Sequence, residues 1–564
     1  MTITADPTPQ TELFSAERAQ LLMPKLSDEQ LAILLPFGAD EPTVVGQVLY
    51  AAGDPRRDLM VVLEGEVEAS DTHEDRRRPI VVFRPRDFIA ELGLLTGQRA
   101  FTTCVVTQAG SILRVPRQAV KAVIDADGAL GELLLQTMFR RREVLLMLGA
   151  GVQIIGSRYS PDTQRLREFA ARNRLAYAWV DLDTDPGAPP LLRSLGFTPR
   201  ETPVVLLGGA GALVNPSNGE LATAVGIAEE PHSGAVFDLL VVGAGPAGLA
   251  AAVYGATEGL STAVVDAVAA GGQASTTSRI ENYLGFPTGI SGTEFGERAL
   301  LQAQRLGAQM FVAHAAASLS HPDSHYLVTL DNGAELFGKA VIIATGVAYR
   351  RLDVAGIERF EGMGVFYSPL DADQVASGDP VVIVGGGNSA GQAATALAAS
   401  GHRVTIAVRG AGLAETMSTY LLDRIAHEPL ITVSPNTVVA AVGGNRQLES
   451  VTLEDRASGG RSDVPTHALF AMIGSEPRTE WLDGAVQRDR YGFILTGEDV
   501  AATVHAADGW AALGRGPGLF ETSLPGVFAV GDVRSGSVKR VAGAVGEGSM
   551  AVRLVQQYLG QVSV

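Results

Sequence analysis

Cysteine is almost absent from this sequence, because Cys104 is the only one among 564 residues. A single thiol excludes an intrachain disulfide, a C-x-x-C redox pair and a metal site built from several cysteines. The nine histidines form no set with metal-ligand spacing. We therefore expect no thiol–disulfide exchange by the chain's own residues and no metal site.

Positive charge is also scarce, since 44 Lys and Arg residues stand against 62 Asp and Glu residues, giving a net charge of −18. This balance argues against nucleic acid as a partner. No apolar run approaches the roughly 20 residues of a membrane span. Residues 1–20 lack the basic start and apolar core of a signal peptide and form a polar tail. We expect a cytoplasmic protein without a membrane span.

Glycine, in contrast, is abundant with 65 residues, and apolar residues make up 46% of the chain. The length suits about three or four domains of roughly 100–200 residues each, and the composition favours a multidomain α/β protein. We expect domains at 21–149, at 150–228, at 237–348 together with 470–564, and at 349–469, with a linker at 229–236.

One stretch, Phe237 to Gly248, organises the rest of the chain. Its apolar run predicts a buried parallel strand, which Gly243, Gly245 and Gly248 follow as G-x-G-x-x-G before a helix. The first glycine makes a tight turn, the second lets a pyrophosphate approach the backbone, and the third lets the helix pack on the strand. Asp266 ends the next strand, close to the roughly 20-residue spacing of a ribose-binding acid. We predict a dinucleotide site; the alternative is a glycine-rich turn without a ligand.

A second unit of the same kind follows the apolar strand 381–384. Its G-x-G-x-x-A turn comprises Gly385, Gly387, Asn388, Ser389 and Ala390. The next strand ends at Arg409, where a ribose-binding acid would otherwise stand. A cation there suits a 2′-phosphate and favours NADPH over NADH, although Gly410 follows where a second arginine would strengthen the site. The alternative for Arg409 is an ordinary surface charge.

From Asp238 onward the chain resembles the low-molecular-weight thioredoxin reductases. The resemblance rests on the first turn, on G-G-Q at 271–273, on A-T-G at 344–346 and on T-S-L-P-G-V-F-A-V-G-D at 522–532. It implies two Rossmann-like three-layer domains, FAD, NADPH or NADH, and a homodimer. The residues it assigns to FAD are Gly243, Gly245, Gly248, Asp266, Gln273, Asn282, Gly531, Asp532 and Arg540.

The decisive departure from that family lies at 367–373, which reads Tyr-Ser-Pro-Leu-Asp-Ala-Asp where the reductases have Tyr-Cys-Ala-Thr-Cys-Asp-Gly. Ser368 and Asp371 take the places of both redox cysteines. The resemblance therefore implies that NAD(P)H can reduce FAD, while the electrons leave to a quinone, oxygen, a ferredoxin or another protein. The alternatives are a thioredoxin-disulfide reductase, as the family relation by itself predicts, and a flavin or nucleotide sensor with little turnover.

The N-terminal domain shows short strand-like runs separated by turns. Runs at 43–50, 58–63, 67–70, 79–83, 102–107 and 111–115, with Gly65 among the turn residues, predict a small β-barrel with flanking helices. The stretch 86–103 resembles the phosphate-binding cassette of cyclic-nucleotide-binding domains. This resemblance implies that Glu91 binds a ribose hydroxyl and Arg99 the cyclic phosphate, because a guanidinium fork suits a phosphate.

Three residues of this cassette depart from the family: Ala90 replaces a glycine, and Ala100 and Phe101 replace a hydroxyl-bearing and a small residue. The domain is therefore either a cyclic-nucleotide receptor or a docking or dimerisation module. The basic run 140–142 lies beside acidic residues, and we expect it to be a solvated face.

Residues 152–227 alternate strands and helices in the order of a thioredoxin fold, with Pro203 where that family has a cis-proline. Residues 160–163 read Ser-Pro-Asp-Thr in place of the C-x-x-C motif. Without a thiolate the domain cannot exchange disulfides, and we expect it to act as a spacer, docking surface or dimer element.

Overall fold

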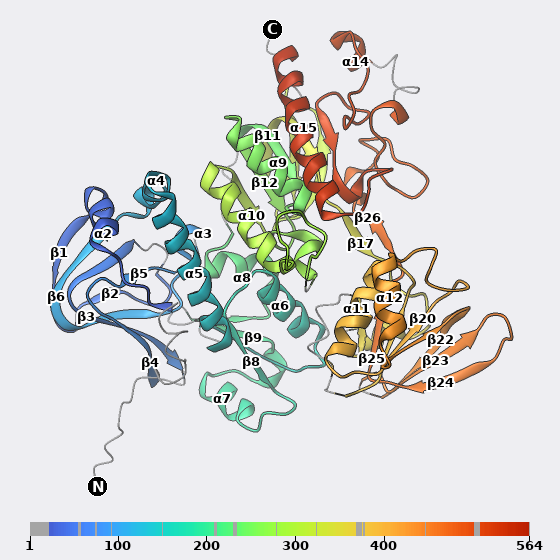
Figure 1. Cartoon of the computed structure of the whole chain (residues 1–564), viewed down its shortest axis with the longest axis horizontal. Coiled ribbons are helices and arrows are strands. Elements are labelled where there is room, and N and C mark those ends of the chain that lie inside the picture. Colours follow the sequence, from blue (N-terminus) through green and yellow to red (C-terminus); the bar gives the residue numbers. More distant parts are fainter. Residues whose placement is uncertain are drawn as a thin grey trace. The chain divides into compact units, whose positions relative to one another are not determined.

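The computed structural model describes residues 22–54, 58–73, 76–91, 93–96, 98–148, 151–207, 211–228, 234–277, 279–322, 324–361, 363–367, 375, 378–445, 447–500 and 508–562. The chain divides into two compact units, Met1–Glu230 and Pro231–Val564, which run from blue to teal and from green to red in Figure 1. Within the described part of the chain, no helix combines the length and the apolar character needed to cross a membrane.

The first unit begins with an antiparallel six-stranded sheet in the order β1-β6-β3-β4, with β2 on β6 and β5 on β3. Its strands are β1 (Ala39–Thr43), β2 (Val48–Tyr50), β3 (Leu59–His73), β4 (Arg76–Phe83), β5 (Phe88–Ile89) and β6 (Thr103–Val115). The helices are α2 (Asp28–Leu34), α3 (Gly93–Thr96), α4 (Arg117–Ala126) and α5 (Gly128–Leu148). Alternate residues of β3 and β6 fill its core, where Cys104 is buried.

Three predicted strand boundaries in this sheet are wrong. The predicted pairs 58–63 with 67–70, and 102–107 with 111–115, are the single long strands β3 and β6. Gly65 has φ +85°, and a Cβ on it would lie 2.4 Å from the Gln108 carbonyl oxygen, so this glycine forms a bulge inside the paired strands rather than a turn between them. Conversely, the predicted strand 43–50 is divided into β1 and β2 by a turn at Gly46, whose φ is +84°.

A four-stranded sheet in the order β10-β9-β7-β8 completes the first unit. Its elements are β7 (Val152–Gly156), α6 (Pro161–Arg172), β8 (Tyr177–Asp181), α7 (Ala188–Ser194), β9 (Val204–Leu207), β10 (Gly211–Val214) and α8 (Asn218–Val225). This order of strands and helices matches the prediction, and the Thr202–Pro203 peptide bond is cis. Ser160 caps the start of α6, because its side chain accepts a hydrogen bond from the Thr163 amide.

The second unit contains a seven-stranded sheet in the order β13-β12-β11-β16-β15-β14, with β27 on β16. The strands are β11 (Val236–Val242), β12 (Thr262–Asp266), β13 (Gln309–Val312), β14 (Ala316–Ser320), β15 (Tyr326–Leu330), β16 (Glu335–Ile343) and β27 (Val527–Ala529). The helices are α9 (Pro246–Thr257), α10 (Gly292–Leu306), α14 (Asp508–Leu513) and α15 (Val541–Val562). Strands β11, β12, β13, β16 and β27 are parallel, as predicted for a dinucleotide-binding domain.

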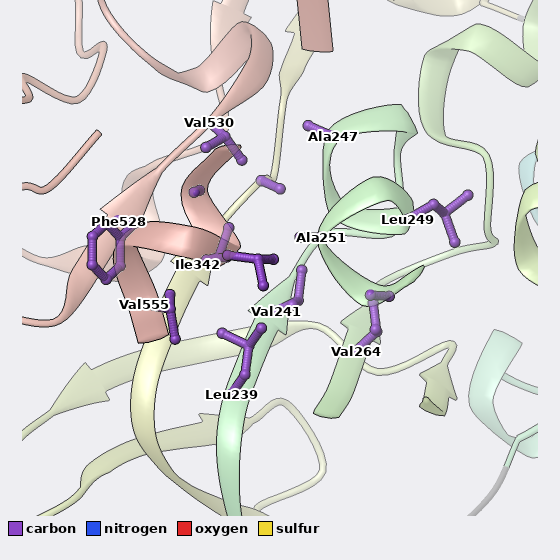
Figure 2. Close-up of a cluster of buried hydrophobic side chains, with 14 of the residues drawn as sticks. Leu239, Val241, Ala247, Leu249, Ala251, Val264, Ile342, Phe528, Val530 and Val555 are labelled. Carbon is purple, nitrogen blue, oxygen red and sulfur yellow. The ribbon is translucent and has the colours of Figure 1, made fainter. Parts of the chain in front are cut away.

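Both faces of these parallel strands are buried. Figure 2 shows Leu239 and Val241 of β11 near Ile342 of β16, Phe528 and Val555 in one apolar cluster. Their sequence neighbours Leu240 and Val242 point to the opposite cluster. Because side chains alternate along a strand, a strand buried on both sides must be apolar throughout, which is why Leu239 to Val242 is uninterrupted. Helices α9 and α15 therefore hold the carboxyl end of β11 in a fixed position.

A second, five-stranded parallel sheet has the order β18-β25-β19-β20-β21. Its elements are β18 (Val365–Phe366), β19 (Val381–Val384), α11 (Asn388–Ala399), β20 (Val404–Ala407), α12 (Thr419–His427), β21 (Ile431–Ser434) and β25 (Ala468–Ala471). Three antiparallel strands lie between β21 and β25 in the chain: β22 (Thr437–Gly443), β23 (Ser450–Asp455) and β24 (Arg461–Pro465). The chain enters through β17 (Val347–Tyr349) and leaves through β26 (Ser475–Pro477), which pair with each other.

Candidate functional site

The first glycine-rich turn joins β11 to α9, and two of its three glycines are required by the fold. Gly243 has φ +108°, and a Cβ there would lie 2.3 Å from the Ala344 carbonyl oxygen. A Cβ on Gly248 would lie 1.8 Å from the Gly243 carbonyl oxygen. Neither position has room for a side chain, so these two glycines bring helix, turn and strand together.

The middle glycine of this turn differs, because nothing in the protein requires it. Gly245 is the N-cap of α9 with φ −72°, which any residue can adopt. A Cβ on it would meet only the Cα of Gly272, at an ordinary 3.9 Å. The turn therefore leaves open space directly in front of the N-terminus of a 12-residue helix. Free N–H groups and the positive end of the helix dipole favour a phosphate there.

The second turn repeats this arrangement between β19 and α11. Gly385 has φ +136°, and its Cβ would lie 2.1 Å from the Met472 carbonyl oxygen. Ala390 takes the place of the third glycine and is fully buried against the sheet. Gly387, the N-cap of α11, has φ −90°, and its Cβ would meet nothing within 4 Å. Both turns thus combine a closed first position with an open middle position.

Asp266 lies beside the first turn, as the sequence predicts. Its Oδ2 accepts a hydrogen bond from the Ala244 amide at 2.8 Å, and its Oδ1 accepts from the amides of Val268 and Ala269 at 2.9 and 3.0 Å. These bonds fix the carboxylate at the carboxyl end of β12. One of them comes from Ala244, the residue before Gly245. Binding of a ribose by Asp266 stays a prediction.

Residues of the second turn occupy less enclosed positions. Asn388 and Ser389 are exposed, and the Asn388 side-chain oxygen accepts a hydrogen bond from the Ser418 amide at 2.8 Å, which holds the segment before α12. Arg409 is exposed two residues after β20. Among the ion pairs of the described residues, none includes Arg409, so its charge is available to a ligand.

Near the C-terminus, Gly531 and Asp532 follow β27 at the same edge of the sheet as the first turn. Gly531 has φ +72°, and its amide donates to Oε2 of Glu547 at 2.7 Å. Glu547, on α15, also pairs with Arg534 at 2.7 Å and accepts from the Ser537 hydroxyl at 3.1 Å. Sequence reasoning missed Glu547 and Arg534, because no motif marks a helix residue that holds a turn 16 residues earlier.

Two charged residues lie in this region, the partly buried Asp532 and the exposed Lys539. Burial raises the pKa of the Asp532 carboxyl, nearby Glu547 raises it further, and Lys539 opposes the shift. Burial lowers the pKa of Lys539, and Asp532 opposes that shift. The Lys539 ammonium lies 4.5 Å from the centre of the Phe493 ring and donates to the Ser475 hydroxyl on β26 at 3.3 Å.

We expect Asp532→Asn to stabilise the ligand-free chain while weakening FAD binding. The pKa of Asp532 is raised in the folded state, so the proton is bound more tightly there than in the unfolded chain. The stability linked to this proton is present at low pH and is lost as the pH rises through the folded pKa. Thermal unfolding of apoprotein across a pH series tests this: the variant's advantage should grow as pH rises and then level off. A gap that is equal at every pH contradicts the assignment.

The remaining residues predicted to bind FAD differ in their exposure and in their hydrogen bonds. Gln273 lies in the turn after β12, and its side-chain amide donates to the Val347 carbonyl of β17, the strand that enters the second sheet. Asn282 is exposed. Arg540 is exposed just before α15, where its carbonyl accepts from the Ala544 amide at 2.9 Å. Ser368 and Asp371 lie outside the described residues.

In the first unit, both cassette residues already have partners within the chain. Glu91 accepts from the Thr102 hydroxyl at 2.7 Å, and the Arg99 guanidinium donates to the Gly53 carbonyl at 3.0 Å. The Arg99 amide donates to the Val225 carbonyl at the end of α8, at 3.0 Å. The Phe101 ring packs with residues of α5 and with Ala176 before β8. The cassette is therefore joined to the four-stranded sheet's own helices and loops.

The prediction that 140–142 is a solvated face is wrong for two of its three arginines. Arg141 is partly buried on α5, where its guanidinium donates to the carbonyls of Phe88 and Ala90 at 2.8 and 3.2 Å. Burial lowers its pKa to about 10. Arg142 donates to the carbonyls of Asn173 and Arg174 just after α6. Both arginines satisfy main-chain oxygens, and those of Arg142 belong to the segment after α6. Sequence neighbours cannot reveal these contacts.

Two models of protein families match this chain. The model of the pyridine nucleotide-disulphide oxidoreductase family matches residues 237–548, which include both glycine-rich turns. The model of the cyclic nucleotide-binding domain matches residues 45–127, which include the cassette.

Relatives and solved structures each cover a little over half of the chain. A thioredoxin reductase of Treponema pallidum is 32% identical over 323 residues, 57% of this chain and 97% of that protein. An NADH dehydrogenase of Bacillus subtilis is 32% identical over 323 residues, 57% of this chain and 58% of that protein. The structure of Lactococcus lactis thioredoxin reductase has a TM-score of 0.52 at 26% identity, covering 58% of this chain and 100% of its own. That of T. acidophilum thioredoxin reductase has a TM-score of 0.51 at 29% identity, covering 58% and 99%.

Proposed function

Since the chain belongs to the pyridine nucleotide-disulphide oxidoreductase family, whose members are FAD-dependent NAD(P)H oxidoreductases, we propose that it passes electrons from NAD(P)H through FAD to an acceptor other than an internal disulfide. The observation that carries this proposal is the pair of open glycines, Gly245 and Gly387, each at the N-terminus of a 12-residue helix. Two turns with this geometry suit two dinucleotides in one unit of the chain.

The residues of the chain bind and orient rather than react. The N-termini of α9 and α11 would hold the pyrophosphates of FAD and of the coenzyme. Asp266 would accept a hydrogen bond from a ribose hydroxyl of FAD. The amides near Asp532 and the start of α15 would hold the other end of the FAD. FAD, when bound, supplies the group that accepts hydride from the nicotinamide. No side chain is required as an acid or base for that transfer.

The electron acceptor must differ from that of the disulfide reductases, because this chain has too few cysteines to form an internal disulfide. Cys104 is the only cysteine, and it is buried in the sheet of the first unit. Ser368 and Asp371 stand where the reductases have their cysteines. A quinone, oxygen, a ferredoxin or another redox protein can accept electrons directly from reduced FAD. A thioredoxin-disulfide reductase activity, the alternative that several relatives' names raise, needs a partner that supplies both thiols.

Anaerobic titration of the FAD-loaded protein tests this proposal. We expect NADPH, or NADH, to bleach the flavin's visible absorbance with an end point of one equivalent per FAD, because no dithiol is present to take a second pair of electrons. Consumption of two equivalents contradicts a flavin-only carrier. Fast bleaching without turnover on any small acceptor supports the sensor alternative. No bleaching by either coenzyme contradicts the oxidoreductase proposal.

For the first unit we propose regulation of this reaction, through a cyclic nucleotide or through docking. The partners of Glu91 and Arg99 within the chain favour docking, because a cyclic phosphate must displace the Gly53 carbonyl from Arg99. The same titration with cyclic AMP or cyclic GMP present distinguishes the two: a changed reduction rate supports the nucleotide, and an unchanged rate supports docking. A homodimer and a cytoplasmic location complete the proposal.

A further inference from the structure

A second arginine, Arg456, is connected through the main chain to the segment after β20, where the predicted coenzyme site lies. Gly410, directly after Arg409, leaves the second position of the predicted 2′-phosphate site without a side chain. Its carbonyl accepts a hydrogen bond from the Asn436 amide at 2.8 Å, and the Asn436 carbonyl accepts from the Arg456 amide at 2.8 Å. Two consecutive main-chain hydrogen bonds therefore connect Gly410 to Arg456.

This connection follows from the topology after β21. Asn436 has φ +53° and makes the turn between β21 and β22. Thr437, the first residue of β22, donates to the Val408 carbonyl at 2.8 Å and pairs with Asp455, the last residue of β23. The turn between β23 and β24 is thereby held at the carboxyl end of β20, where a coenzyme ribose lies in this type of sheet. Strand β22 contacts β20, and Figure 1 shows β22, β23 and β24 next to one another.

The side chain of Arg456 carries an exposed positive charge. Arg409 and Arg456 are both exposed, and neither forms an ion pair with any residue that the structure describes. The acid next to Arg456 is occupied elsewhere, because Oδ1 of Asp455 accepts from the amides of Ala457 and Ser458 at 2.7 and 3.1 Å. In contrast, Arg461 on the same hairpin pairs with Glu454 at 2.7 Å.

We propose that Arg409 and Arg456 together bind the 2′-phosphate of NADPH and so make this chain selective for NADPH over NADH. This inference rests on the proposed oxidoreductase function and adds a specificity residue to it. A phosphate dianion is recognised best by two guanidinium groups, since each supplies a fork of N–H donors. Arg456 takes the place of the side chain that Gly410 lacks.

The test compares Arg456→Gln with the matched control Arg461→Gln in the full-length, FAD-loaded protein. Both variants lose one exposed positive charge from the same hairpin. We expect R456Q to weaken NADPH binding by about tenfold, the equivalent of one charged hydrogen bond. The measure of binding is the NADPH concentration that gives half-maximal flavin reduction. NADH should be unaffected, and R461Q should resemble wild type with both coenzymes. Equal losses with NADPH and NADH, or equal losses in both variants, overturn the inference.

Two further measurements keep the inference separate from the proposed function. Adenosine 2′,5′-bisphosphate carries the phosphate without the nicotinamide, so calorimetry reports binding even if no coenzyme reduces the flavin. Its affinity should fall about tenfold in R456Q and not in R461Q. The double variant R409Q/R456Q should lose less than the product of the single losses, because residues that hold one phosphate are coupled. Unchanged bisphosphate affinity in R456Q overturns the inference whatever the flavin does.

Discussion

Gly245→Val yields a folded protein that does not retain FAD. The valine Cβ lies in open space, 3.9 Å from the Cα of Gly272, so the chain itself accommodates it. A pyrophosphate at the N-terminus of α9 needs that same space, and a branched side chain forces it away from the helix N–H groups. Losing two such charged hydrogen bonds corresponds to at least about 100-fold in FAD affinity. The ratio of flavin absorbance to protein after purification, and FAD titration of the apoprotein, measure it.

Gly560→Val is the matched control for this variant. A Cβ on Gly560, in the last helix, meets nothing within 4 Å, and this residue lies 28 positions after Asp532, away from the turn. Thermal unfolding of both apoproteins separates ligand loss from misfolding. G245V apoprotein should unfold close to wild-type apoprotein, whereas Gly248→Val should not fold normally, because its Cβ would overlap the Gly243 carbonyl. Full retention of FAD by G245V argues against a pyrophosphate at this turn.

Gly387→Val has the complementary effect: it keeps FAD and loses reduction by both coenzymes. Gly387 caps α11 with φ −90°, and its Cβ would meet nothing within 4 Å, so the substitution leaves the fold intact. The valine occupies the space where the coenzyme pyrophosphate approaches the helix. We expect the coenzyme concentration for half-maximal flavin reduction to rise at least about 100-fold with NADPH and with NADH.

Chemical reduction provides the control for G387V. Dithionite reduces the flavin without a coenzyme site, so it should bleach G387V and wild type equally. Comparison with R456Q is equally informative. R456Q should weaken the binding of NADPH alone, whereas G387V should weaken the binding of both coenzymes, because both carry the pyrophosphate. A G387V protein that NADPH still reduces at the wild-type concentration means that the second turn does not bind the coenzyme.

Much of the dinucleotide-binding half is predictable because its signals are local. The apolar strand Leu239–Val242, the glycine turn and Asp266 lie within one βαβ unit, where sequence spacing fixes spatial distance. The same holds for Gly385 to Ala390. In the first unit, local signals misplace the strand boundaries at Gly65 and Gly46, since a glycine in a bulge and a glycine in a turn look alike in sequence.

The sequence by itself determines the chemistry that this protein lacks and the number of nucleotides it is built for. One cysteine excludes an internal disulfide whatever the fold, and two glycine-rich turns after apolar strands predict two dinucleotide sites. The tertiary structure decides which glycines the fold needs and which leave space for a ligand, because that depends on Ala344, Gly272 and Met472. It also decides that Glu547 holds Gly531 and that Arg456 is connected to Gly410. Gly531 and Glu547 are 16 positions apart, and Gly410 and Arg456, linked through Asn436, are 46 positions apart. Only the folded chain brings residues at such separations together.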